Sequence, residues 1–487
     1  MTVPFSLPRS ARPWLAGGLA ALLGLAIAYW PPLWTAAILS GIALLFIVTV
    51  EPLAGLALAL WLGPAAAWEV TFWGNPLSSG QLLLFLTLGA WLGQGVLRRR
   101  LVIPRLPLNW PLTLFLLVGA ISLWRAVSVW DGIKELGKWL EMLLVMWLVV
   151  DRVGRRWPGT RRQAGLACVV GMLLLSGLSQ AALGVWQFAG RGTGPEAFQI
   201  FGRYYRAFGT FQQPNPFGGH LSLTLALAAG AVLGLIAARP ARRWQAWVWP
   251  ALLLAACALL VVGLLGSWSR GAWLNCAAAL STLAFLAPRR RTWGIGVALG
   301  AVCLLAFVWQ QGWLPTAVAD RLTGFVADFQ WGDIRGVDIN DENYAVLERL
   351  AFWQSARDMA RRHPWLGVGL GNYAVAYPAF ALINWPHSLG HAHNYYLNLL
   401  AEVGVAGLLV YLALWSVIFV QAWRCLGRLD WPERGLALGL MAAWIGLSVH
   451  NLLDNLYVNN LYIHLGAMFG LLMCLRLESS QASPTNS

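Results

Sequence analysis

The feature that most constrains this chain is a series of apolar stretches, each close to the length of a membrane-spanning helix. A helix of about 20 residues crosses the hydrocarbon core of a bilayer, which is roughly 30 Å thick. Inside that core each backbone N–H and C=O must be paired within the protein, so helices are expected. Only 11% of the residues are charged, against about 25% in an average soluble domain. The sequence therefore predicts an all-α integral membrane protein.

Fourteen apolar segments are candidate spans, so we expect about 12–14 transmembrane helices. They lie at about 14–30, 33–50, 53–68, 78–97, 109–127, 133–150, 163–189, 215–237, 246–266, 269–287, 292–312, 396–423, 435–453 and 456–475. Gly63 and Pro64 interrupt the third segment. The first resembles a signal peptide, but a second apolar stretch follows at once, so we interpret it as an uncleaved span.

The distribution of arginine and lysine sets the predicted orientation. If alternate loops face opposite sides of the membrane, 21 of the 34 basic residues fall on the side of the N-terminus. Cytoplasmic loops of membrane proteins carry such an excess of positive charge. We therefore expect both termini in the cytoplasm. The same bias accounts for the net charge of +14 without a nucleic-acid partner.

The spans and the polar segments between them divide the chain into five parts. These are N-terminal spans at 1–189, central spans with outward arginine motifs at 190–312, an extracytoplasmic loop domain at 313–395, C-terminal spans at 396–478 and a disordered tail at 479–487. Within the loop domain, residues 344–362 have the apolar pattern of an amphipathic helix, which Asp341 or Asn343 could cap and Pro364 would end. We therefore expect short helices in this one large loop.

Several arginines lie at the mouths of spans on the predicted outer face. Arg203 and Arg206 belong to GRYYRAFGTFQQPNPFGGH, and Arg270 belongs to SWSRGAWL. Each one alone could be a snorkelling side chain that anchors a helix at the interface. A cluster of guanidinium groups there suits a phosphate or pyrophosphate on a lipid, because the planar fork binds such oxygens bidentately and stays charged.

Histidines lie on the same predicted face, at His387, His391 and His393 in HSLGHAHNYYLNLLAEVG. A neutral imidazole can take a proton from a sugar hydroxyl as a general base. The alternative is a histidine that only hydrogen-bonds to backbone at a helix start. Asp454, between the last two spans, could orient a histidine, pair with an arginine or cap a helix.

The sequence gives little support for a bound cofactor or a disulfide framework. The six cysteines lie in or beside apolar stretches and form no CxxC pair. The pair His391 and His393 has no carboxylate or cysteine close by in the sequence to complete a metal site. The acidic stretch at 333–342 lacks the spacing of a calcium loop. The glycines at 367–371 lack the strand context of a dinucleotide site and predict a tight turn.

Four motifs occur together in the C-terminal half of the chain. They are RAFGTFQQPNPFGGHL at 206–221, SWSRGAWL at 267–274, RLAFWQSARDMARRHPWLGVGLGNY at 349–373 and HAHNYYLNLLAEVGVAGL at 391–408. In this order they resemble the O-antigen ligase and polymerase superfamily of bacterial membrane glycosyltransferases. The first six spans match that family only in hydrophobicity.

The resemblance implies roles for particular residues. Arg206 and Arg270 correspond to a pair that grips a pyrophosphate, with Arg203 as the other candidate for the first position. His393 resembles the base that activates the acceptor, and His391 its neighbour. Further candidate substrate-binding residues, from the third and fourth motifs, are Arg349 and Asn394.

The resemblance also implies partners and a location. The donor would be a glycan on undecaprenyl pyrophosphate, and the acceptor hydroxyl would belong to a lipid, a glycan or a protein. Transfer would occur on the extracytoplasmic face of the bacterial inner membrane, without metal or nucleotide, and would invert the anomeric centre. The alternative is a lipid-linked glycan flippase or another polytopic transporter, which would need charged groups along a path through the membrane midplane.

Overall fold

The computed structural model describes residues 31–65, 69–72, 75–99, 103–154, 159–238, 244–288, 290–313, 316–324, 332–340 and 343–479, together with residues 17, 18, 24 and 329. Thirteen long helices in this part of the chain coincide with thirteen of the predicted spans. They are α2 (Pro32–Val50), α3 (Pro52–Leu62), α4 (Ser79–Leu97), α5 (Asn109–Ser122), α6 (Val129–Val149), α7 (Thr160–Val185), α8 (Pro214–Ala237), α9 (Val248–Gly266), α10 (Arg270–Leu286), α11 (Arg291–Gln310), α15 (Tyr395–Leu426), α16 (Glu433–His450) and α17 (Leu461–Ser479). The predicted span at 14–30 lies largely outside the described residues.

Eight of the described helices are long and apolar enough to cross a membrane. The predicted all-α integral membrane fold is therefore confirmed. The prediction for 53–68 was too long, because α3 ends at Leu62 after only 11 residues. Gly63 and Pro64 follow the helix end, and proline has no backbone N–H with which to continue the helical hydrogen bonds. A helix this short does not span a bilayer by itself.

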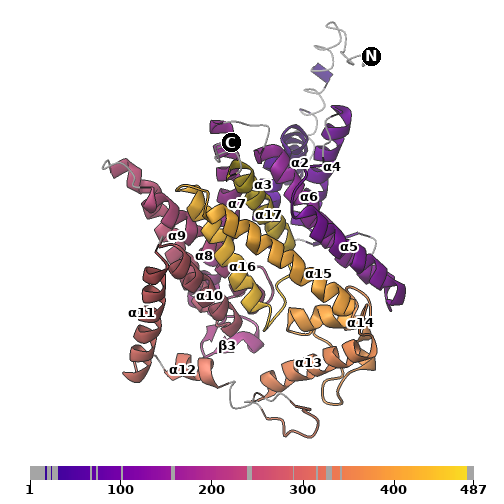
Figure 1. Ribbon diagram of the computed structural model, residues 1–487. Helices are drawn as coiled ribbons and strands as arrows, with labels where there is room; N and C mark the ends of the chain where they lie inside the picture. The colour runs from indigo at the N-terminus through magenta and orange to yellow at the C-terminus, as the bar shows by residue number, and fades with distance from the viewer. Residues whose placement is uncertain are drawn as a thin grey trace, which may run out of the picture.

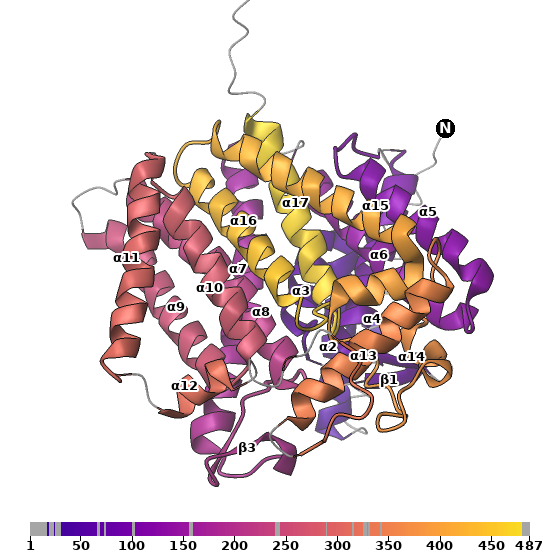
Figure 2. The same cartoon turned by 60° about the horizontal axis from the view of Figure 1, so that its bottom comes forward.

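The helices pack side by side in a bundle, with α17 at its centre (Figure 2). Helix α17 contacts α6, α7, α15 and α16, and nearly all of its residues are buried. Close packing elsewhere relies on glycine. Gly230 and Gly234 of α8 face Gly435 and Gly439 of α16, where an added Cβ would meet backbone atoms at 2.4–3.2 Å. Small residues four apart let two backbones approach in this way in membranes.

The loop that follows α11 contains three helices at one end of the bundle (Figure 1). They are α12 (Thr316–Thr323), α13 (Tyr344–Arg362) and α14 (Tyr373–Ala376). The amphipathic helix predicted at 344–362 is thus confirmed as α13, and its apolar side, including Leu347 and Phe352, is buried. Asn343 stands at its N-cap position without capping it, since its side chain accepts from the Asn340 amide at 2.9 Å instead. Asp341, the other predicted cap, lies outside the described residues.

Two short antiparallel hairpins accompany the helices. One pairs β1 (Glu69–Phe72) with β2 (Asn75–Ser78), and the other pairs β3 (Gln199–Ile200) with β4 (Tyr204–Tyr205). The second hairpin fixes the start of the first arginine motif. Arg206 follows β4 directly, and its backbone N–H donates to the Phe198 carbonyl at 2.8 Å.

The span predicted at 396–423 is interrupted, because Gly404 within α15 has φ 64° and ψ −165°. Only glycine adopts this backbone conformation readily. The break leaves an amide and a carbonyl of α15 free to bind the loop: Val405 N–H donates to Pro364 O at 2.8 Å, and Ala401 O accepts from Val368 N–H at 2.9 Å. The glycine turn predicted at 367–371 makes these contacts, with Gly367 at φ 63° against the α15 backbone. The loop is therefore fastened to the bundle at a broken helix.

The fold and the charge bias together predict the orientation of the chain. Helix α10 is 17 residues long, or about 25 Å, so Arg290 beyond its end lies far from Arg270 at its start. In a variant with all six cysteines replaced by alanine, we expect Asp333→Cys to react with a membrane-impermeant maleimide in intact cells. Arg290→Cys should react only after the cells are permeabilised. The reverse labelling pattern would show that the predicted orientation in the membrane is wrong.

Candidate active site

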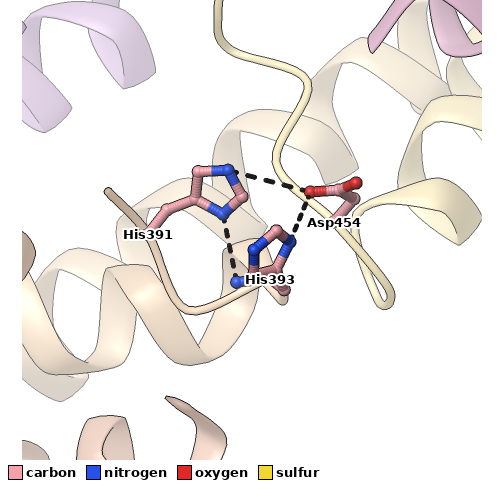
Figure 3. Close-up of side chains that lie close together, drawn as sticks. All are labelled: His391, His393 and Asp454. Atoms are coloured by element: carbon pink, nitrogen blue, oxygen red, sulfur yellow. Dashed lines mark hydrogen bonds and ion pairs between the residues drawn. The ribbon is translucent and has the colours of Figure 1, made fainter. Parts of the chain in front are cut away.

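Two histidines and a carboxylate meet where the loop joins the bundle (Figure 3). His393 Nδ1 lies 3.0 Å from Asp454 Oδ1, and His391 Nε2 lies 3.8 Å from the same oxygen. The two imidazole rings are 4.3 Å apart between centroids. Asp454 comes from the segment between α16 and α17, whereas the histidines directly precede α15. The fold thus joins residues that are 61 positions apart.

Backbone geometry holds the histidine pair in place. His393 has φ 50°, a left-handed conformation that costs energy for a residue with a side chain. In this conformation its N–H donates to Nδ1 of His391 at 3.1 Å. Asn394, predicted to bind substrate, caps α15 through its Oδ1, which accepts from the Leu397 amide at 3.0 Å. Trp353 of α13 donates from Nε1 to the His393 carbonyl at 3.4 Å.

Asp454 also connects the histidines to the first arginine motif. Its Oδ2 accepts from Asn215 Nδ2 at 2.8 Å. The Asn215 carbonyl oxygen in turn accepts from Nη2 of Arg206 at 3.3 Å. Arg206 is further held by its Nε, which donates to the Ser267 carbonyl at 3.0 Å. A continuous chain of hydrogen bonds therefore runs from Arg206 to His393.

Two more of the predicted arginines share a pocket beside Asp454. The pocket encloses about 90 Å³. It is lined by Asn215, Arg270, Gly271, Phe329, Val346, Arg349, Leu350, Trp353, Leu453 and Asp454. Arg270 is the first residue of α10, whose N-terminus is capped by Ser269, and Arg349 lies on α13. The pocket is thus formed between the bundle and the loop.

Arg203 and His387 lie apart from this group. The Arg203 guanidinium lies 4.4 Å from the centre of the Tyr204 ring, donates to the Tyr204 hydroxyl and is exposed. His387 is exposed as well. Of the two arginines considered for the first position of the pair, the structure brings Arg206 to the site.

The site is strongly positive. Burial, together with the charges of Arg321, Arg349 and Arg270, lowers the pKa of Arg206 to about 9. Burial, followed by the neighbouring His393, lowers the pKa of His391 to about 4, so this ring is neutral at pH 7.

The carboxyl of Asp454 behaves in the opposite way. Burial raises its pKa, but the hydrogen bond from His393 and the surrounding positive charges outweigh that effect and hold the pKa far below its usual range. The carboxylate therefore remains ionised at neutral pH.

Part of this site is not indicated by the sequence motifs. Asn215 lies inside the first arginine motif, where nothing singles it out, and Arg321 and Glu348 lie in the loop without any motif that marks them. Asp454 supplies the carboxylate that the sequence around His391 and His393 lacks for a metal site. One ligand atom each from His391, His393 and Asp454 lies within 4.8 Å of the others, close enough for the three residues to hold a metal ion.

A comparison with models of known protein families matches residues 255–412 to a family described as O-antigen ligase. This region contains Arg270, Arg349 and both histidines, whereas Arg206 and Asp454 lie outside it. No curated protein matches the chain significantly. The apolar helices and the match together support a multi-pass membrane enzyme that transfers glycosyl groups. The match over residues 255–412 agrees with the family predicted from the motifs.

The role of Asp454 can be tested by an isosteric change. Asp454→Asn keeps the shape of the side chain but removes the charge that orients and stabilises His393. By analogy with buried aspartates that support a catalytic histidine, we expect glycosyl transfer to fall on the order of a thousandfold. Asp358→Asn, which alters an exposed ion pair on α13, is the matched control. Near-normal transfer by the Asp454 variant would show that the carboxylate is only structural.

Proposed function

We propose that the protein transfers a glycan from an undecaprenyl-pyrophosphate carrier to an acceptor hydroxyl on the extracytoplasmic face of the bacterial inner membrane. One observation carries this proposal. A pocket lined by Arg270 and Arg349 reaches Asp454, the same carboxylate that holds His393. A proton acceptor and a group of fixed positive charges therefore meet at one place, as a transfer from a phosphorylated lipid requires.

His393 is the general base in this proposal. Asp454 accepts the Nδ1–H of its ring, which leaves Nε2 with a lone pair for the acceptor hydroxyl. Both nitrogens of His391 are already engaged, because Nδ1 accepts the His393 amide and Nε2 faces Asp454. His391 is thus a positioning residue that shapes the backbone of His393 and supports the carboxylate.

Arg206 and Arg270 hold the pyrophosphate in the proposed reaction. The acceptor oxygen attacks the anomeric carbon as the bond between that carbon and the pyrophosphate oxygen breaks. The bonding electrons pass to the pyrophosphate, and the hydroxyl proton passes to Nε2 of His393. A single displacement of this kind inverts the anomeric centre. The guanidinium groups stabilise the charge that develops on the leaving group, so the step needs no metal ion.

Replacement of His393 should lower the rate of transfer but leave donor binding unchanged. A general base contributes about a hundredfold to ten-thousandfold, so His393→Ala should lower transfer by that factor. We expect a smaller loss from His391→Ala and none from His387→Ala, which removes an exposed histidine of the same loop. The measurement is mass spectrometry of the product formed from purified protein, a lipid-linked glycan and candidate acceptors.

The same assay contains two further controls. Transfer should continue in an excess of chelator, since the proposed step uses no metal. If the chelator stops transfer and added zinc or manganese restores it, then His391, His393 and Asp454 bind a metal ion instead. If His391→Ala lowers transfer more than His393→Ala does, His391 is the general base.

Loss of a bidentate arginine should weaken donor binding. Charge-assisted contacts of this kind are strong, so Arg270→Ala should raise the dissociation constant for the lipid-linked donor by on the order of a hundredfold. Arg270→Lys should recover only part of the affinity, because an ammonium group lacks the planar fork. Arg203→Ala is the control. Binding can be measured by fluorescence anisotropy with a labelled donor, and normal affinity in a stably inserted Arg270→Ala protein would make Arg270 a simple interfacial anchor.

A further inference from the structure

Arg321, on the loop helix α12, lies close to the arginines of the bundle at the turn between α9 and α10. Its Nη2 donates to the Trp268 carbonyl at 3.2 Å. The preceding carbonyl, that of Ser267, accepts from Nε of Arg206. Arg270 follows two residues later. Figures 1 and 2 both show α12 beside the start of α10. The turn between α9 and α10 thus gathers three guanidinium groups from three separate segments.

One donor of Arg321, its Nε–H, is buried and forms no hydrogen bond with any described residue. A buried charged donor is costly when it is left unpaired. Because Nη2 is tied to the bundle backbone, the guanidinium is held in place with its Nε–H available to a ligand.

The charges around Arg321 indicate what kind of ligand this is. Arg206 and Arg349 are both electrostatically coupled to it, and burial together with Arg349 lowers the pKa of Arg321. Asp454 and Glu348 are carboxylates that interact electrostatically with Arg349. Four guanidinium groups at the same place suit a ligand with several negative charges, such as a pyrophosphate diester.

We propose that Arg321 binds the donor pyrophosphate through its free Nε–H, as a fourth guanidinium of the site. This inference rests on the function proposed above. Arg206 and Arg270 come from the bundle, whereas Arg321 and Arg349 come from the loop. The donor is held from both sides, and its two phosphate groups offer oxygens to more of the four guanidinium groups than a single phosphate does. Arg321 therefore sets the preference for a pyrophosphate over a monophosphate.

The test compares two probes on the full-length protein in detergent micelles. The affinities of undecaprenyl pyrophosphate and undecaprenyl monophosphate are measured by competition against a labelled donor. We expect Arg321→Gln to weaken pyrophosphate binding about tenfold to a hundredfold and monophosphate binding by less than threefold, so that the preference falls. Arg321→Lys should restore part of the preference. Arg335→Ala, which removes an exposed arginine of the same loop that is paired with Asp333 and Asp358, should change neither affinity.

The outcomes separate this inference from the proposed function. If Arg270→Ala loses pyrophosphate affinity while Arg321→Gln keeps both wild-type affinities, the inference about Arg321 is wrong and the function stands. If the wild-type protein shows no preference for pyrophosphate, the proposed function fails together with the inference. An equal loss for both probes in Arg321→Gln, at an unchanged melting temperature, would also overturn the inference, because Arg321 would then provide only general attraction for anions.

Discussion

The buried carboxylate of Asp454 is the contact on which the geometry of the site depends. One of its oxygens interacts with His391 and His393, and the other accepts from Asn215 of the bundle. Asn215 continues the chain to Arg206. A carboxylate buried at this depth would be unstable if it were alone, because removal from water penalises the charged form. The surrounding donors offset that penalty, so the proton acceptor and the anion site are fixed relative to each other.

The broken helix α15 imposes a second constraint. A helix that ran straight through Gly404 would pair its own amides and present none to the loop. With Gly404 in a left-handed conformation, the amides after the break bind Pro364 and Trp365, and the carbonyls before it bind the glycine turn. Non-helical backbone near a membrane is tolerated where protein satisfies its polar groups. The same break places Tyr395–Val403 against the loop, so the histidines immediately before it lie over the bundle.

The sequence predicts some of these features and not others, for physical reasons. Apolar segments about 20 residues long specify helices locally, which explains the agreement at α8 or α11. Arg270 and His393 were recognised because they stand in motifs beside spans. The partnership of Asp454 with His393 and the position of Arg321 depend on contacts between distant segments, which local patterns do not encode. The choice of Arg206 over Arg203 depends on the β3–β4 hairpin, since the two residues are only three positions apart and only one follows the returning strand.

The arginines also explain how a site of this kind favours reaction over mere binding. Four neighbouring guanidinium groups repel one another, and this repulsion adds to burial in lowering the pKa of Arg206. In the proposed reaction, a donor with two negative charges relieves part of this repulsion. When the bond between the anomeric carbon and the phosphate oxygen breaks, that oxygen gains negative charge, so the attraction grows along the reaction coordinate. Interactions that strengthen in this way lower the barrier, whereas those of constant strength only tighten binding.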